Sequence, residues 1–383
     1  MAKSAVVIGA GIVGLATARA LATRGYQVTV IERSSKAIGA SIRNFGMIWP
    51  IGQPEGKLYE RALHAKSIWK EVLAGAKCWS YEGGSLHMAY QNDEFEVMQQ
   101  FAGVSAHRPV RILNAIETLE KSPAVNGSGL LGSLYSADEM IVDPREAIAA
   151  IPGYLETVLG VAFIWNTAIS QIAYPNVSSG SKSWSADEIY VCSGQDFETL
   201  YPEQFSAAPL TKCKLQMLRL EAQPDNWKIG PALCGGLSLI HYHGFKAAAS
   251  LPGLKARYER EYSEYLKWGI HVMASQNGLG EITVGDSHEY ALTFDPFDRE
   301  FINTMILDYL ATFARFKSPK VFQTWHGIYP KMTNGATEIV LKPESGVTII
   351  NGLGGNGMTL SFGLCDEVVA GTYNPILKDP AYS

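Results

Sequence analysis

The sequence predicts an α/β (α+β) fold in which a Rossmann-like dinucleotide-binding domain carries an inserted second domain, built on a mixed or antiparallel sheet. Two observations predict the first domain. An apolar strand runs into a glycine-rich turn and a helix at the N-terminus, and residues 346–370 repeat the order of strand, glycine-rich turn and helix. Between about residues 210 and 316, short strands separated by turns are instead typical of an antiparallel sheet. Both ends of the chain are therefore expected to build the nucleotide domain.

Composition and charge argue against a nucleic-acid-binding protein, a disulfide-bonded protein and a membrane protein. The chain has 383 residues, 47% of them hydrophobic, and a formal net charge of −5 without any run of Lys or Arg, which argues against a nucleic-acid partner. Its five cysteines are widely spaced and include no C-x-x-C pair, so we expect reduced thiols, no metal site and a cytoplasmic location. Met1 lies just before the first strand, and no apolar run approaches the roughly 18 residues that span a bilayer. We expect neither a signal peptide nor an integral membrane segment.

The N-terminal turn has the spacing of a dinucleotide fingerprint. Gly9 permits a tight turn, Gly11 lets backbone N–H groups approach a pyrophosphate, and Gly14 lets the helix pack closely on the strand. Glu32 ends the second strand eighteen positions after Gly14, near the roughly 20 expected of an acid that binds a ribose 2′-hydroxyl. A purely structural glycine turn is the alternative, but strand, helix, second strand and acid all lie in register.

The remaining elements follow from periodicity and turn residues. Asp143 is a plausible N-cap with Pro144 at the first helical position, and Ser178–Ser183 is the expected tip of a hairpin. Helices are expected at 54–73, 94–101, from 144 onward, 255–267, 298–316 and from the 354–357 turn to 370; strands are expected at 84–90, 161–172, 188–194, 214–220, 237–243, 270–273, 281–284 and 346–351.

The second glycine turn, Gly354-Gly355-Asn356-Gly357, favours a flavin over a nicotinamide. A nicotinamide dinucleotide needs one place where backbone N–H groups and a helix N-terminus converge. A flavin dinucleotide needs two, one for the pyrophosphate and one for the negative charge on the reduced ring. The alternative is a glycine-rich loop ahead of a terminal docking helix.

Taken together, these segments resemble the D-amino-acid oxidase, glycine oxidase and sarcosine oxidase family of FAD enzymes. The resemblance covers the N-terminal fingerprint and residues 41–47, 142–144, 191–194, 283–286, 325–330 and 354–360. It implies two-electron oxidation of the C–N bond of a small-molecule amine, with hydride transfer to the flavin and hydrolysis of the resulting imine. It also implies an FAD-binding domain of residues 1–80, 141–208 and 318–383, and a substrate-binding domain of residues 81–140 and 209–317, whose sheet roofs the flavin.

The resemblance also implies the residues that bind FAD. They are Gly9, Gly11, Gly14, Glu32, Arg33, Ser41, Arg43, Asn44, Gly194, Gly354, Gly355, Asn356, Gly357 and Met358. Sarcosine oxidases can hold the flavin through a cysteine just past the 325–330 region, but no cysteine lies between Cys234 and Cys365 here. Noncovalent FAD is therefore expected.

The chain departs from the family where the substrate carboxylate would bind. Many of these oxidases have Trp-x-Gly-Leu-Arg-Pro, whose arginine grips the carboxylate, whereas this chain has Tyr329 in place of that arginine. A second carboxylate-binding arginine of glycine oxidase aligns with Gly355. A plain α-amino acid bound in the family manner is therefore not expected.

The candidate catalytic residues are Met47, His271, His288 and Tyr329. Met47 aligns with a residue that lines the pocket of glycine oxidase, and the two histidines are expected to project from strands of the substrate sheet. Five of the eight histidines fall between residues 241 and 326, in the segment expected to roof the flavin.

Residues 213–217 and 325–329 look similar to a glycine-oxidase-like branch associated with phosphonate use. That similarity implies 2-aminoethylphosphonate or its N-methyl form as substrate. The alternatives are an oxidase or dehydrogenase of glycine, sarcosine or a D-amino acid, a non-catalytic flavoprotein redox sensor, and an NAD-linked dehydrogenase. A flavin hydroxylase is disfavoured because no glycine-rich turn follows Gly285-Asp286-Ser-His288. The electron acceptor, oxygen or another, and any oligomer stay open.

Overall fold

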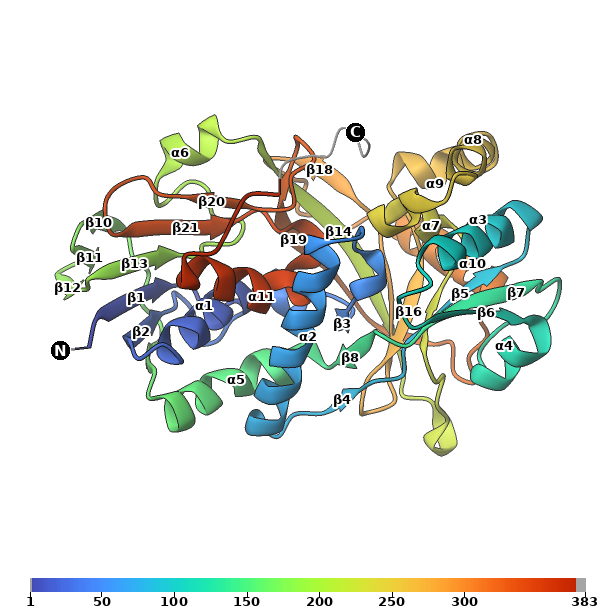
Figure 1. Cartoon of the computed structure of the whole chain (residues 1–383), viewed down its shortest axis with the longest axis horizontal. Coiled ribbons are helices and arrows are strands. Elements are labelled where there is room, and N and C mark those ends of the chain that lie inside the picture. The colour runs from blue at the N-terminus through green and yellow to red at the C-terminus, as the bar shows by residue number, and fades with distance from the viewer. Residues whose placement is uncertain (1, 377–383) are drawn as a thin grey trace.

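The computed structural model describes residues 2–376 and contains two large sheets that share one chain (Figure 1). The six-stranded sheet has the order β20 (Ile339–Leu341), β21 (Val347–Asn351), β13 (Glu188–Val191), β1 (Ser4–Ile8), β2 (Gln27–Ile31) and β9 (Ala162–Ile164). Its strands are parallel except for β20, which runs antiparallel at one edge. This is the expected Rossmann-like sheet, and both ends of the chain contribute to it.

The second sheet has nine strands. Eight follow the order β18 (Glu289–Ala291), β14 (Leu210–Leu220), β17 (Ile282–Gly285), β16 (Met273–Gln276), β15 (Ala232–Cys234), β5 (Ser85–Ala89), β7 (Gly132–Ser136) and β6 (Val110–Asn114), and β19 (Val321–Met332) pairs with β14. The β5–β15 pair is parallel and the other pairs are antiparallel, so the sheet is mixed, as expected.

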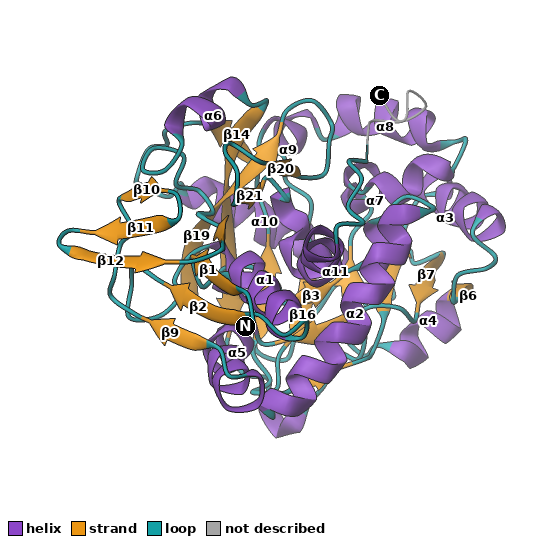
Figure 2. Ribbon diagram, turned by 60° about the vertical axis from the view of Figure 1, so that its left-hand side comes forward, coloured by secondary structure: helices purple, strands orange, loops and turns teal. Residues whose placement is uncertain are grey.

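Two small sheets complete the strands. They are β10 (Gln171–Ala173), β11 (Asn176–Ser179) and β12 (Lys182–Ser185), which extend away from the rest in Figure 2, and β3 (Met47–Ile48), β8 (Met140–Val142) and β4 (Ser80–Tyr81). The tip between β11 and β12 lies within the predicted hairpin tip.

The helices divide between the two large sheets. In Figure 1, α1 and α11 lie over the six-stranded sheet, and α1, α2, α5 and α11 pack on one another around a buried apolar cluster. The helix bounds are α1 (Ile12–Ala22), α2 (Lys57–Ala76), α3 (Asn92–Val104), α4 (Ala115–Lys121), α5 (Pro144–Leu159), α6 (Pro202–Ala207), α7 (Leu237–His241), α8 (Leu251–Glu261), α9 (Ser263–Lys267), α10 (Glu300–Phe313) and α11 (Gly357–Ala370). No helix within residues 2–376 is both long enough and apolar enough to cross a membrane.

Local capping chemistry explains where two of these helices begin and end. The Asp143 side chain accepts a hydrogen bond from the Arg145 N–H at 2.9 Å, and Pro144 is the first residue of α5, as the sequence predicted. Helix α11 ends at Ala370 because Gly371 adopts a φ of +72°, which favours glycine.

Residues 237–243 were expected to form a strand, and that prediction is wrong. They form α7 and the start of a 3-10 helix at His243–Ala247. Backbone hydrogen bonds from Ser238 to Gly235 and from Leu239 to Gly236 start the helical turns. A side chain at Gly236 would meet the Tyr258 hydroxyl at 2.3 Å, so this close approach requires glycine.

The domain boundary at residue 318 also differs from the observed sheet membership. Strand β19 follows that boundary, yet it pairs with β14 from Leu210 to Leu220 in the nine-stranded sheet. The chain thus leaves the large sheet only after Met332, and β20 and β21 are the strands that return to the six-stranded sheet.

Glu139 links two parts of the fold through a buried carboxyl group. Its Oε1 accepts a hydrogen bond from the Ile51 N–H at 2.9 Å, and its Oε2 accepts one from the Ser85 hydroxyl at 3.0 Å. Burial raises the pKa of this carboxyl to about 7. The two hydrogen bonds of Glu139 therefore connect the turn after β3 to strand β5 of the nine-stranded sheet.

Candidate active site

One cavity of about 1370 Å³ lies where the two large sheets meet. It is lined by both glycine-rich turns, by the 39–45 loop and by residues 286–296 and 326–332 from the nine-stranded sheet and its connections. The predicted nucleotide-binding turns and the predicted substrate-binding sheet therefore line the same cavity.

The N-terminal turn has the steric restrictions that the sequence predicted. Gly9 has a φ of +105°, and a Cβ there would lie 2.4 Å from the Cys192 carbonyl oxygen. A Cβ on Gly14 would lie 1.9 Å from the Gly9 carbonyl oxygen, so α1 can approach the turn only because position 14 lacks a side chain. Glu32 accepts a hydrogen bond from the Ala10 N–H at 2.9 Å, which places its carboxylate beside the turn.

The loop after β2 brings four predicted FAD-binding residues to the cavity wall. Ser41 accepts a hydrogen bond from the Ile12 N–H at 2.9 Å and so caps the first turn of α1. The Asn44 amide bonds to the backbone of residues 40, 41 and 46, and thereby fixes the loop. Arg33 forms an ion pair with Asp196 at 2.7 Å, and the Arg43 guanidinium donates to the His326 carbonyl at 3.1 Å.

The C-terminal turn lies on the same cavity. Gly354–Asn356 form a 3-10 turn that leads into α11, and Asn356 accepts a hydrogen bond from the Gln53 side chain at 2.9 Å. The Met358 carbonyl accepts from the Trp69 indole at 2.7 Å, and the Gly194 carbonyl accepts from Asn351 at 3.0 Å. Two glycine-bearing helix starts, those of α1 and α11, thus line one cavity, as the sequence predicted for a flavin dinucleotide.

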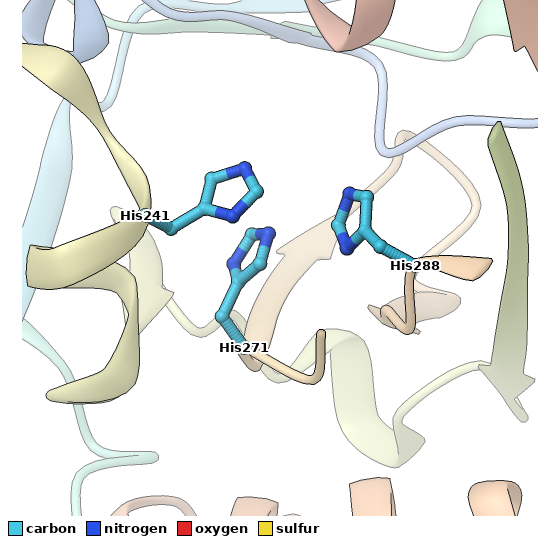
Figure 3. A group of neighbouring side chains, drawn as sticks. All are labelled: His241, His271 and His288. Carbon is cyan, nitrogen blue, oxygen red and sulfur yellow. The ribbon is translucent and has the colours of Figure 1, made fainter. Parts of the chain in front are cut away.

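Three histidines gather beside the cavity, and two of them, His241 and His288, line it (Figure 3). His241 ends α7, His271 lies just before β16, and His288 lies between β17 and β18. The ring centroids of His241 and His271 are 3.7 Å apart, and those of His241 and His288 are 4.9 Å apart. One nitrogen from each ring lies within 4.8 Å of the other two.

Burial sets the protonation of this group. It lowers the pKa of His241 and His271 well below the ordinary value and that of His288 to about 4. The carboxylate of Asp286 lies 3.2 Å from His271 Nε2, and burial raises the pKa of Asp286 well above its ordinary value. Uncharged imidazoles are therefore favoured at this place.

Positive charge and hydroxyl groups lie nearby. The Lys331 ammonium donates to the Tyr290 hydroxyl at 2.8 Å, and burial lowers the pKa of Lys331 while Cys213 and Asp286 oppose that shift. Burial raises the pKa of Tyr329 well above its ordinary value, so this hydroxyl stays protonated and can donate a hydrogen bond.

Of the four candidate catalytic residues, His288 and Tyr329 line the cavity. His271 packs against His241, with ring centroids 3.7 Å apart, whereas Met47 packs in the apolar core of the nine-stranded sheet. His271 and His288 were expected to lie in strands. They lie instead in the connections next to β16, β17 and β18.

Sequence reasoning did not select Asp286 and Tyr290 as site residues. Two signals point to Asp286 in the sequence: it ends the 283–286 segment that resembles the oxidase family, and it stands two positions before His288. Although no metal site was expected, His241, His271 and His288 form a group that can hold a metal ion.

Comparison with known proteins decides the family. The model of the DAO family, described as FAD dependent oxidoreductase, matches residues 4–370. The chain belongs to this family. It is therefore an oxidoreductase, and FAD is its cofactor.

Solved structures confirm the fold. Glycine oxidase from Bacillus cereus superimposes with a TM-score of 0.75 at 17% identity, over 97% of this chain and 96% of that one. An L-alpha-glycerophosphate oxidase from Mycoplasma pneumoniae with FAD bound gives a TM-score of 0.73 at 16% identity, over 100% of this chain and 97% of that one.

Among curated proteins, a D-amino acid dehydrogenase of Helicobacter pylori is 28% identical over 228 residues, which are 46% of this chain and 55% of that relative. The tRNA-modifying bifunctional protein MnmC of Chromobacterium violaceum is 25% identical over 256 residues, 61% of this chain and 36% of that relative. The chain thus spans about half or less of the length of these two relatives.

Proposed function

We propose that this chain oxidises the C–N bond of a small anionic amine, and that the amine is an aminophosphonate such as 2-aminoethylphosphonate or its N-methyl form. FAD, when bound, supplies the acceptor for the hydride that leaves the carbon next to the amine nitrogen. The imine that remains is hydrolysed by water. The chain itself has to bind the substrate, orient that carbon and exclude bulk water.

The observation that carries the proposal is the pair of residues at the two positions of the family's carboxylate-binding arginines. Tyr329 lies in β19 and Gly355 in the turn before α11, and a Cβ on Gly355 would lie 3.5 Å from the Tyr329 hydroxyl. The two positions therefore meet at one place on the cavity wall without a guanidinium fork. A planar carboxylate is held best by such a fork, whereas a tetrahedral phosphonate can accept several single hydrogen bonds.

Unpaired cations next to this place support an anionic substrate. Two of the cavity's basic residues, Arg33 and Lys212, form ion pairs with Asp196 and Glu198. Neither Arg43 nor Lys331 forms an ion pair within the described part of the chain, although both line the cavity. Their positive charge is available to a bound anion.

The runner-up function is oxidation of an amino acid such as glycine, sarcosine or a D-amino acid. It is favoured by the likeness to glycine oxidase and by the relatives named D-amino acid dehydrogenase. Arg43 is then the cation that would face the carboxylate, as a single guanidinium held by the His326 carbonyl.

Anaerobic flavin reduction by a panel of amines tests both functions. We expect 2-aminoethylphosphonate or its N-methyl form to reduce the flavin at least tenfold more efficiently than glycine, sarcosine or D-alanine, an advantage of about 1.4 kcal/mol in transition-state binding. A clear preference for any of the three amino acids would support the runner-up. Flavin that no amine reduces would indicate a non-catalytic flavoprotein.

A further inference from the structure

We propose that His241, His271 and His288 form a binding site for a divalent transition-metal ion of the zinc class beside the substrate cavity, and that Asp286 orients His271 in that site. The flavin chemistry of the family does not itself call for such an ion. The proposal rests on the arrangement and the unused hydrogen-bonding capacity of these four side chains.

The three rings converge from separate segments of the chain (Figure 3). One nitrogen of each lies within 4.8 Å of the other two, whereas nitrogens that share a tetrahedral zinc ion at about 2.0–2.1 Å lie about 3.3 Å apart. His241 lies at the end of the short helix α7, and its side chain is partly exposed toward the cavity.

The hydrogen bonds leave the ligand atoms free. His288 Nδ1 lies 2.9 Å from the Gly269 carbonyl, so it donates its proton there and leaves a lone pair on Nε2. Metal-binding histidines are usually oriented in this way by a carbonyl or a carboxylate. His271 Nδ1 is buried and has no hydrogen-bond partner within residues 2–376, while the Nε2 of the same ring lies 3.2 Å from the Asp286 carboxylate. Buried polar atoms normally have partners, so the free Nδ1 points to a missing ligand.

Asp286 is placed to orient His271. Its carboxylate oxygens lie 3.2 Å from His271 Nε2 and 3.9 Å from His288 Nε2. Three imidazoles that leave a fourth position open are a ligand set that zinc accepts. The alternative is an anion site made of protonated imidazoles, but two imidazolium rings would repel each other at the 3.7 Å centroid distance between His241 and His271.

The ion would also add positive charge where the substrate is expected. Coordination by an anionic oxygen of the substrate at this ion rests on the proposed function. Metal binding itself does not, because the ion can be measured on the resting holoenzyme without any substrate.

Metal binding is tested on tag-free, FAD-loaded protein that has been stripped with a chelator and dialysed. Zn²⁺ is then titrated in competition with a chromogenic chelator, and bound metal is counted by elemental analysis against FAD. We expect one ion per chain in the wild type. His271→Ala and His241→Ala should each weaken Zn²⁺ binding at least tenfold.

His326→Ala is the matched control. His326 also lines the cavity, but its Nδ1 pairs with Asp298 at 2.9 Å, so its replacement should leave Zn²⁺ affinity unchanged. FAD content and Tm show whether each variant is folded. The His241→Ala change, at a partly exposed position, serves if His271→Ala is unstable.

Two results would overturn the proposal. One is a wild type that retains no Zn²⁺ above the level of the His241→Ala protein, and the other is unchanged affinity in both variants. If zinc does not bind but 2-aminoethylphosphonate still reduces the flavin, the metal site falls and the proposed function stands. If zinc binds and no aminophosphonate reacts, the metal site stands and the proposed substrate falls.

Discussion

Gly9→Ala tests whether the N-terminal turn requires glycine for two separate reasons. The backbone at Gly9 has a φ of +105°, and an added Cβ would lie 2.4 Å from the Cys192 carbonyl oxygen, about 1 Å inside normal contact. The backbone strain costs about 1–3 kcal/mol, and the overlap with a second backbone costs a further ~1–3 kcal/mol. The turn can relieve the overlap only by moving away from β13, and that movement displaces the start of α1.

Gly25→Ala is the matched control. Gly25 also has a positive φ, +83°, but nothing lies within 4 Å of its Cβ position, so only the strain remains. We expect Gly25→Ala to lower Tm modestly with full FAD content, and Gly9→Ala to lower Tm further and to lose FAD. Bound flavin absorbance per protein and a thermal melt give both values. Equal Tm and equal FAD content in the two variants would refute the steric argument.

Three further predictions concern charge and the cofactor. Because burial raises the pKa of Glu139 to about 7, the folded state keeps a proton that the unfolded chain loses near pH 4.5. The stabilising contribution of Glu139 is therefore complete below about pH 4.5 and falls by about 1.4 kcal/mol per pH unit up to about pH 7. Glu139→Gln has no such titration, so the Tm of this variant minus the Tm of the wild type should increase as the pH is raised from about 4.5 to about 7. Lys331→Met should weaken binding of an anionic amine about ten- to a hundredfold, measured by flavin difference spectra, with unchanged FAD content, whereas the exposed Lys342→Met should change neither. Denaturation should release FAD intact, and flavin that stays with the precipitated protein would contradict noncovalent binding.

Local chemistry made part of the fold predictable from the sequence. The cap at Asp143 and the glycine at 371 fixed the start of α5 and the end of α11, because each acts within one helical turn. The strand predicted from Leu237 to His243 was wrong, because alternating apolar residues fit a strand as well as a short helix. The close approach of Tyr258 to Gly236, at the start of this helix, comes from a residue in α8 and is not visible in the local pattern.

Of the candidate site, only the residues expected to bind the cofactor could be predicted from the sequence. Glycine turns bind through the backbone, and their spacing is visible along the chain. The histidine group depends on the ends of α7, β16 and β17 meeting in space, which no spacing between positions 241, 271 and 288 encodes. For the same reason the sequence did not show that β19 pairs with β14 in the nine-stranded sheet: a sequence gives the order of strands but not which strands become neighbours.

The central claim is that the cavity selects a tetrahedral anion over a planar one, and one matched pair of substrates tests it most directly. 2-Aminoethylphosphonate and β-alanine share the same aminoethyl chain and differ in the anionic group. Anaerobic stopped-flow reduction of the flavin should be at least tenfold more efficient with the phosphonate, about 1.4 kcal/mol in transition-state binding, because Tyr329 and Gly355 leave no arginine fork for the carboxylate. Equal or faster reduction by β-alanine would contradict the account.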